Sequence, residues 1–252
     1  MIRKFLPAII RSPLWGNREK YGGNIDVNHK DWIEWLNFNN KFYTKTQKEG
    51  AGKIVNNWGY KVIGNINLNG MSVLEIGAGN LPHRRFWKGL PAEYHLVDVD
   101  DNFLQESKTK LSELKIGAKL HHLERGEFPV IDDDSLDVIF TFYSLEHLFD
   151  LDKQLQFYYS KLKEGGFLIG AIPHEGGLAW GLGRFLTTRR FVHKNTDLNY
   201  DRIICWEHPN YCDDILNKIL EMGFLQKRQF GYPFGFLAPK DLNLVTSFIY
   251  EK

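Results

Sequence analysis

The sequence predicts an α/β fold, a doubly wound and mostly parallel sheet with helices on both faces. Between residues 70 and 172, short apolar runs alternate with longer stretches whose apolar residues recur at helical spacing. This alternation is typical of parallel strands joined by crossover helices. The run at 136–142 is apolar almost throughout, as expected for a strand covered on both faces. A chain of 252 residues is long enough to bury the core of such a domain.

The elements of this domain follow in order along the chain. Five strands are expected, at 72–76, 93–99, 118–123, 136–142 and 167–172. A helix follows the second strand, with Asp100 or Asp101 at its start, and another follows the fourth strand and should stop at Gly165-Gly166. The domain is completed by a helix at 213–222 and by two strands at 224–232 and 244–250.

Residues 1–69 precede this domain, which spans 70–252, and contain no convincing strand. Their aromatic residues, including Trp32, Trp35 and Tyr43, recur at helical spacing. We expect a helix there, capped by Asp31, that forms a lid or flank. The alternative is that its aromatic side chains only cover one edge of the sheet.

A second segment, 173–207, is too long for an ordinary connection between elements. Its tryptophan and phenylalanine residues argue against disorder. We therefore expect a folded insert at 174–207, directly after the fifth strand. Its aromatic side chains suit a sugar face or a ring, and its arginines, such as Arg184, suit a phosphate or carboxylate.

Composition excludes several classes of function. The net charge is only +1, so no strong field draws the chain to nucleic acid or anionic lipid. No apolar stretch approaches the ~20 residues that span a bilayer, so no integral membrane segment is expected. The two cysteines form no CxxC pair, which favours a reducing, cytoplasmic setting. The acids Asp132–Asp134 are interpreted as a solvated turn, and no metal ligand is assigned. The sequence does not determine the oligomeric state.

The most informative stretch is 73–80, an apolar strand that ends in a carboxylate and two closely spaced glycines. Gly77 and Gly79 allow positive φ and let a ligand approach the backbone closely. About nineteen residues further on, the second strand ends in Asp98, where a carboxylate can accept hydrogen bonds from both hydroxyls of a ribose. Together the two signals predict a nucleotide-like ligand at this edge of the sheet.

These residues resemble the class I S-adenosylmethionine-dependent methyltransferases, of the methyltransferase type 11/12 kind, over roughly residues 70–250. Glu75, Gly77 and Gly79 match the family's E-x-G-x-G motif, and Asp98 matches the acid that ends its second strand. Further matches are the acidic stretch 124–137, Leu145-Glu146-His147, and Leu162-Lys163-Glu164-Gly165-Gly166-Phe167-Leu168. The resemblance implies a seven-stranded sheet whose last strand is antiparallel, with S-adenosyl-L-methionine as cofactor.

The resemblance also implies roles for individual residues. Asp98 would bind the ribose, Val99 would pack on the adenine, and Glu75 would hold the amino group of the methionine moiety. Glu124 and the backbone N–H of Arg125 would meet the adenine amino group and ring nitrogen, although Glu127 competes for that role. The sequence departs from the family at Leu81, where a third glycine is common, and this leaves the loop's shape open.

The reaction expected is O-methylation of a small-molecule or sugar-containing acceptor. The acceptor should bind under the insert, because ligands of such sheets bind beyond the carboxyl ends of the strands. His147 and His174 follow the fourth and fifth strands and are the candidate general bases, while His208 is a weaker one. The segment 172–177 with Trp180 also resembles bacterial methyltransferases found with surface-polysaccharide enzymes. The alternatives are a nicotinamide-dependent oxidoreductase, against which Leu81 weighs, and a non-catalytic binding module with this fold.

Overall fold

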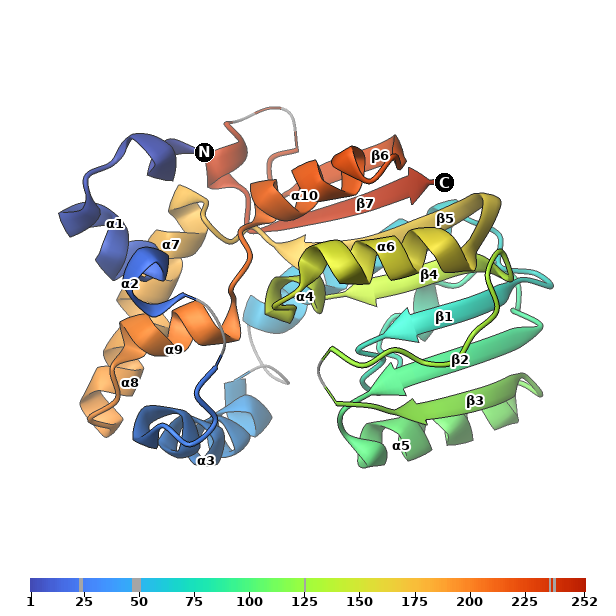
Figure 1. Cartoon of the computed structure of the whole chain (residues 1–252), viewed down its shortest axis with the longest axis horizontal. Helices are drawn as coiled ribbons and strands as arrows, with labels where there is room; N and C mark the ends of the chain where they lie inside the picture. Colours follow the sequence, from blue (N-terminus) through green and yellow to red (C-terminus); the bar gives the residue numbers. More distant parts are fainter. Residues whose placement is uncertain (23–24, 47–50, 125, 236, 238) are drawn as a thin grey trace.

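The computed structural model describes residues 1–22, 25–46, 51–124, 126–235, 237 and 239–252, and its centre is a seven-stranded sheet (Figure 1). The strand order is β3-β2-β1-β4-β5-β7-β6. The strands are β1 (Ser72–Ile76), β2 (Glu93–Asp98), β3 (Gly117–His122), β4 (Leu136–Phe142), β5 (Leu162–Pro173), β6 (Leu225–Tyr232) and β7 (Val245–Glu251). Neighbouring strands from β3 to β5 pair in parallel, and β7 is antiparallel to both β5 and β6. The predicted fold class is therefore confirmed.

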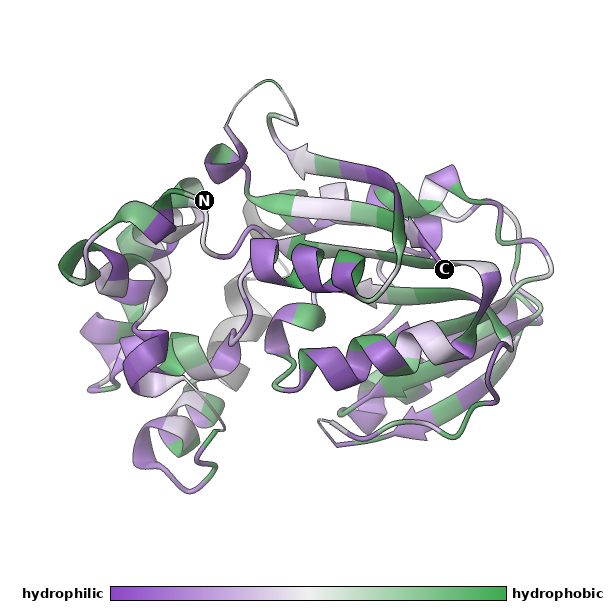
Figure 2. Ribbon diagram, turned by 45° about the horizontal axis from the view of Figure 1, so that its top comes forward, coloured by the Kyte–Doolittle hydropathy of each residue, from purple (hydrophilic) through white to green (hydrophobic). Residues whose placement is uncertain are grey.

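Helices cover both faces of the sheet. On one face lie α6 (Leu151–Lys161) and α10 (Cys212–Glu221), and on the other α4 (Ala51–Tyr60) and α5 (Asp101–Glu113). Successive residues of a strand point to opposite faces, so Val73 joins the cluster under α5 and Leu74 the cluster under α6. Both side chains are fully buried, and Figure 2 shows how apolar residues dominate the central strands. This double coverage explains the nearly continuous apolar runs in the sequence.

The remaining helices gather beside the carboxyl ends of the strands, at the left in Figure 1. They are α1 (Ala8–Trp15), α2 (Arg18–Tyr21), α3 (Lys30–Thr46), α7 (Leu178–Arg184), α8 (Arg190–Asn195) and α9 (Tyr200–Glu207), with a π-helical turn (Phe185–Arg189) between α7 and α8. The last three helices form the insert after β5, which is folded as the sequence predicted. Among the described residues, no helix has the length and apolar content to cross a membrane.

The N-terminal helix α3 packs on the insert. Trp32 and Trp35 contact Trp206 and Tyr200 of α9, with ring centroids 6.2 and 6.3 Å apart. Asp31, expected as the helix cap, instead lies inside the first turn and pairs with Arg202 at 2.7 Å. These aromatic side chains therefore join the N-terminal segment to the insert. The ring of Tyr43, which was assigned to the same stripe, lies outside the described side chains.

The boundary between α6 and β5 differs from the expectation. The helix ends at Lys161, because Leu162 already has extended backbone angles and pairs with Leu136 of β4. The prediction that Gly165-Gly166 stop the helix is therefore wrong: both glycines lie within β5. The boundary is set by the pairing of the fully buried Leu162 with β4, and not by the two glycines that follow it.

The close approach of β5 to β4 gives a test of the sheet. A Cβ on Gly170 would lie 2.2 Å from the backbone oxygen of Thr141, which cannot move without breaking the strand pairing. We expect Gly170→Ala to lower the free energy of unfolding by about 1–3 kcal/mol, the usual cost of overpacking. Urea denaturation measures this change.

Gly183→Ala is the matched control. Gly183 lies in α7, and a Cβ there meets no atom within 4 Å. We expect this change to be neutral or to stabilise by up to ~1 kcal/mol, because alanine favours helix over glycine. Equal stability of the two variants would contradict the described packing of β5 on β4.

Candidate functional site

The turn after β1 leaves open space above its second glycine. Gly77 and Gly79 have φ values of 70° and 50°, in the left-handed region. The backbone N–H of Gly77 donates to the carbonyl of Val97 on β2 at 2.9 Å. A Cβ on Gly77 would lie 3.1 Å from the Cβ of Ser144, whereas a Cβ on Gly79 would meet nothing within 4 Å. The turn is thus closed toward β4 at Gly77 and open at Gly79.

Leu81 shows how the chain does without a third glycine. Its φ is 54°, so it takes the left-handed conformation that glycine adopts without strain. Its N–H donates to the carbonyl of Ala78 at 3.2 Å, and its side chain is buried in the core under α5. Burial of this side chain offsets the cost of the backbone conformation. The departure from the family motif therefore leaves the turn intact.

Asp98 lies at the carboxyl end of β2, beside this turn. One carboxylate oxygen accepts from the N–H of Gly79 at 2.8 Å, and the other accepts from the N–H of Asp100 at 3.0 Å. The residue is half-buried, and this burial raises the pKa of the carboxyl, although the two backbone N–H groups partly oppose the shift. Each carboxylate oxygen has a second lone pair, so Asp98 can accept further hydrogen bonds. The next side chain, Val99, is 52% exposed.

Glu75 lies deeper, on the same strand as the turn. It is fully buried, and its two carboxylate oxygens contact the ring Nε2 of His83 at 2.6 Å and the hydroxyl of Tyr94 at 2.5 Å. The indole N–H of Trp87 donates to the other ring nitrogen of His83, so the neutral ring donates from Nε2 to Glu75. Both oxygens of Glu75 therefore have partners inside the protein. The sequence analysis did not predict these contacts with His83 and Tyr94.

The third-strand loop is only partly described. Glu124 is exposed, and its backbone N–H donates to the carboxylate of Glu127 at 3.0 Å. Glu127, the alternative to Glu124 for contacting the adenine, thus accepts a hydrogen bond within its own loop. Arg125 lies outside the described residues.

His147 lies in a short 3-10 helix, η4 (Leu145–His147), directly after β4. Its ring Nδ1 lies 2.6 Å from the backbone carbonyl of Glu207 at the end of α9, and its ring is partly exposed. Because η4 begins next to Ser144, which faces Gly77, His147 lies on the same edge of the sheet as the turn.

Glu146 is the residue that sequence reasoning missed, although it stands inside the matched Leu145-Glu146-His147 motif. It is 2% exposed, and burial raises its pKa to about 7, an effect that the nearby His147 ring partly opposes. Its Oε1 lies 3.8 Å from Nε2 of His147. Its Oε2 has no hydrogen-bond partner among the residues that the structure describes. A buried carboxylate oxygen in this state is unusual and calls for an explanation.

His174 is placed differently from His147. It is 4% exposed, its Nδ1 lies 2.9 Å from the hydroxyl of Thr246 on β7, and the thiol of Cys212 lies 3.5 Å from the same nitrogen. Burial lowers the pKa of the ring to about 4, so it is neutral at pH 7. Its Nε2 is buried and has no partner within the described part of the chain. The two candidate histidines thus differ in access: His147 reaches the surface and His174 does not.

Glu175 anchors the insert. This fully buried carboxylate accepts two hydrogen bonds from Arg184, at 2.8 and 2.6 Å, and one from Trp180 at 2.8 Å. Nδ1 of His208 lies 3.0 Å away. Burial alone would raise the pKa of Glu175, but Arg184 and His208 hold it well below its ordinary range. Arg184 and Trp180 are thus engaged within the protein, which corrects the expectation that Arg184 is offered to an acceptor.

One group of side chains in the described part of the chain has the spacing of a metal site. One ligand atom from each of His147, Glu207 and His208 lies within 4.8 Å of the other two. The sequence analysis assigned no metal ligand, and the roughly sixty residues between His147 and Glu207 leave no local spacing that would indicate this group. The short motif Trp206-Glu207-His208 was the only local signal.

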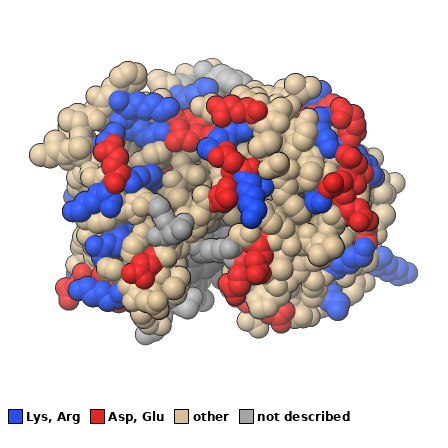
Figure 3. Space-filling view, viewed as in Figure 1, with Lys and Arg blue, Asp and Glu red and all other residues tan. Residues whose placement is uncertain are grey.

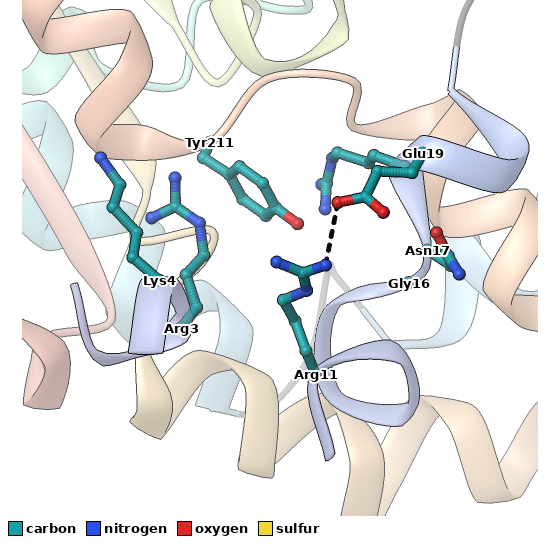
Figure 4. A pocket seen from close by; sticks show the side chains of 8 residues that line it. Arg3, Lys4, Arg11, Gly16, Asn17, Glu19 and Tyr211 are labelled. Carbon is teal, nitrogen blue, oxygen red and sulfur yellow. Dashed lines mark hydrogen bonds and ion pairs between the residues drawn. The ribbon is translucent and has the colours of Figure 1, made fainter. Parts of the chain in front are cut away.

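A separate basic cavity of about 220 Å³ lies between the N-terminus and α10 (Figure 4). Arg3 and Arg18 both line it and stack on the Tyr211 ring, with their guanidinium carbons 3.8 and 3.6 Å from the ring centroid. Arg3 pairs with Asp213 at 2.6 Å, and Arg11 pairs with Glu19 at 3.0 Å. These arginines are thus engaged in holding the N-terminal helices. Elsewhere on the face in Figure 3, Lys and Arg alternate with Asp and Glu without a single dominant sign.

Comparison with known proteins gives a family for the central part of the chain. Residues 74–168 match a family model described as a methyltransferase domain. This segment begins on β1 and ends on β5, so it contains the turn, Asp98 and η4. Comparison with curated protein sequences finds no match.

Solved structures share the fold at low sequence identity. An S-adenosylmethionine-dependent methyltransferase from Mesorhizobium loti is 14% identical, with a TM-score of 0.55 over 78% of this chain and 98% of its own. A putative enzyme of the same kind from Listeria monocytogenes is 15% identical, with a TM-score of 0.55 over 79% and 99%. A possible histamine N-methyltransferase from Thermotoga maritima is 14% identical, with a TM-score of 0.54 over 88% and 99%. These likenesses confirm the fold.

The matched segment covers the glycine turn and the acid at the end of β2, which the sequence had already associated with an adenosyl cofactor. The sheet order and the antiparallel β7 complete the architecture that the resemblance implied. Residues 74–168 therefore match a methyltransferase domain, and the whole sheet shares its fold with S-adenosylmethionine-dependent methyltransferases of known structure.

Proposed function

We propose that this protein transfers a methyl group from S-adenosyl-L-methionine to an oxygen of a small-molecule or sugar-containing acceptor. The observation that carries the proposal is the pairing of Asp98 with the turn, because its carboxylate lies against the N–H of Gly79, over which there is open space. A half-exposed carboxylate with spare lone pairs beside an open glycine turn suits the two hydroxyls of a ribose. The exposed Val99 next to it offers an apolar surface for a purine ring.

The remaining cofactor contacts are proposed on the same basis. We propose that Glu124, which follows β3 next to β2, meets the adenine amino group, and that the backbone N–H of Arg125, outside the described residues, meets the ring nitrogen. For Glu75 the proposal is narrower, because His83 and Tyr94 already contact its two oxygens. We propose that Glu75 meets the methionine amino group through its remaining lone pairs, directly or through a water molecule.

The chemistry is an in-line displacement at carbon. The sulfonium supplies an activated methyl group, and the protein supplies orientation and exclusion of water. The acceptor hydroxyl gives up its proton, its oxygen bonds to the methyl carbon, and the carbon–sulfur bond breaks with its electron pair on sulfur. We propose that His147 assists the loss of that proton, because it is partly exposed and lies on the same edge of the sheet as the turn.

The acceptor would enter beneath the insert at 174–207, beyond the carboxyl ends of the strands. The insert helices stand beside those ends in Figure 1. Phe191 of α8 is partly exposed, and its ring centroid lies 5.8 Å from that of Phe38. An exposed aromatic ring suits the apolar face of a sugar or an aromatic acceptor. We place the reaction in the cytoplasm, following the low cysteine content.

Calorimetry tests the cofactor assignment. We expect S-adenosylhomocysteine to bind with one site per chain and NAD to show no binding, since the turn lacks the third glycine of a dinucleotide fingerprint. Methyl-labelled cofactor, offered with a panel of hydroxylated aromatics and glycans, tests transfer to oxygen. Binding of NAD alone would favour the oxidoreductase alternative, and cofactor binding without any transfer would favour the non-catalytic module.

Replacement of Asp98 tests the ribose contact. We expect Asp98→Ala to weaken the binding of S-adenosylhomocysteine at least tenfold, or about 1.4 kcal/mol, because two hydroxyl hydrogen bonds lose their acceptor. The matched control is Asp101→Ala, which removes an exposed carboxylate from the first turn of α5. An unchanged dissociation constant in Asp98→Ala contradicts the assignment.

The raised pKa of Asp98 predicts a dependence on pH. The charged form accepts the ribose hydrogen bonds, so affinity is full above the raised pKa and falls as pH drops through it. The loss should therefore begin at a higher pH than an ordinary aspartate would give. Calorimetry with S-adenosylhomocysteine from pH 7 to pH 4 measures it. Asp98→Asn should bind weakly and show a flat profile; a variant that keeps the wild-type slope would assign the titration to another group.

Replacement of His147 tests its catalytic role. We expect His147→Ala to lower turnover by roughly 10²- to 10⁴-fold while the affinity for S-adenosylhomocysteine stays within about twofold. His174→Ala is the second arm, because its buried ring predicts a lower melting temperature more than a specific loss of turnover. Normal turnover in His147→Ala, with loss in a stably folded His174→Ala, would move the role to His174.

A further inference from the structure

We propose that His147, Glu207 and His208, with the buried Glu146 beside His147, form a site for a divalent transition-metal ion that holds the acceptor's hydroxyl oxygen. This inference rests on the proposed function for its purpose, but the site can be tested by itself. Two segments make it: η4, directly after β4, and the end of α9 with the residue that follows it.

Hydrogen bonds hold the two segments against each other. Nδ1 of His147 lies 2.6 Å from the carbonyl of Glu207, and the Asn210 amide donates to the carbonyl of Leu145 at 3.1 Å. The rings of His147 and His208 stand edge to face, with centroids 4.7 Å apart. The site therefore requires no large movement of the backbone.

The spacing fits a metal ion. Bonds of about 2.0–2.2 Å from a metal to nitrogen or oxygen place two of its ligand atoms at most ~4.4 Å apart. One ligand atom each of His147, Glu207 and His208 already lies within 4.8 Å of the others. The three ligand atoms therefore have to move closer together, through rotation of their side chains, when an ion binds.

The hydrogen bonds of the two rings match those of metal-binding histidines. Such rings usually donate their other N–H to a backbone carbonyl or a carboxylate, which fixes the tautomer. Nδ1 of His147 has the carbonyl of Glu207 as its acceptor, and Nδ1 of His208 has the carboxylate of Glu175 at 3.0 Å. A ring that donates from Nδ1 carries its lone pair on Nε2, which is the nitrogen that His208 can offer to a metal. In His147, Nδ1 lies 3.8 Å from the carboxylate of Glu207 and Nε2 lies 3.8 Å from that of Glu146.

Glu146 supplies the independent observation. Its carboxylate is buried, its Oε1 lies 3.8 Å from Nε2 of His147, and its Oε2 has no hydrogen-bond partner within the described residues. Burial of such a carboxylate oxygen without a partner is costly. A cation beside His147 would remove that cost, which explains why an acid is placed there.

Neighbouring positive charges are already engaged. Arg184 makes two hydrogen bonds to Glu175, and Arg18 donates to the carbonyls of Trp15 and His208. The carboxylate of Glu207 is therefore left facing the two rings, and it is oriented by a bond of 2.7 Å from the indole N–H of Trp35. Two imidazoles with the Glu207 carboxylate favour Zn²⁺ over Mg²⁺, which prefers oxygen ligands.

The proposed metal site lies beside the turn, where an ion could bind the acceptor hydroxyl. Ser144, which precedes η4, lies against Gly77, so the cluster stands on the edge of the sheet where the methyl group would be presented. A metal ion lowers the pKa of a hydroxyl bound to it, so the proton can leave to water at neutral pH. His147 would then assist the reaction as a ligand that positions this ion.

Metal binding by the purified full-length chain tests the site. After treatment with a chelator, the protein is titrated with Zn²⁺ alone in a calorimeter, and its melting temperature is followed with and without Zn²⁺. We expect one Zn²⁺ per chain at this site and a rise in melting temperature. Because His95 and His121 are also stacked side by side, stoichiometry must be read together with the variants.

Three variants and one control decide the assignment. His147→Ala, His208→Ala and Glu207→Gln should each weaken Zn²⁺ binding at least tenfold, and Glu207→Gln keeps an oxygen to accept from Trp35. The control is His193→Ala, an exposed histidine of α8, which should bind Zn²⁺ like the wild type. No Zn²⁺ binding by the wild type, or equal binding by Glu207→Gln and the wild type, would overturn the proposal.

The two proposals fail in different ways. S-adenosylhomocysteine affinity is measured on the same samples, and we expect the metal-site variants to retain it within about twofold. Loss of Zn²⁺ binding with retained cofactor binding supports the metal site. If the wild type binds Zn²⁺ through these residues but binds no S-adenosylhomocysteine, the proposed function is wrong and the metal site remains.

Discussion

The hydrogen bond from the Gly79 N–H to the Asp98 carboxylate joins the two strand ends on which the candidate site depends. It connects the turn after β1 to the end of β2. At this edge of the sheet the strand order reverses, since β1 lies between β2 and β4. A sheet that winds in two directions from one strand opens a crevice at that point, where ligands bind. The bond fixes the turn after β1 against the end of β2.

Two carboxylates bridge β1 and β2, and their surroundings separate their roles. Glu75 is fully buried, and both its oxygens have close partners, one of them Tyr94 on β2. Asp98 is half-exposed, and its hydrogen bonds within the described residues come from backbone N–H groups, so it retains acceptor capacity toward solvent. The deeper acid therefore holds the strands in register, while the outer acid is the one suited to a ligand. Sequence spacing alone gives both acids equal weight.

A third carboxylate, Glu175, connects the methyltransferase domain to the helices around it. It follows β5 and bonds Arg184 and Trp180 of α7, and it orients the ring of His208 after α9. The side chains of Arg184 and Trp180, which the sequence suggested for an acceptor, are thus bonded to Glu175 instead. The bond to Glu175 also holds the His208 ring next to His147, with which it forms the candidate metal cluster. The insert thus contributes to the site by completing it.

The sequence by itself determined the sheet, the turn and the acid beside it. Each depends on residues close together in the chain: alternating apolar runs, the glycines at 77 and 79, and Asp98 at a fixed distance behind them. The tertiary structure alone decided the end of α6, where pairing of Leu162 overrode the glycine signal, and the burial of His174. It also decided the cluster at His147, because residues about sixty positions apart meet only when α9 packs against η4. Local pattern reports periodicity and turns, whereas the partners of a polar side chain depend on which elements pack together.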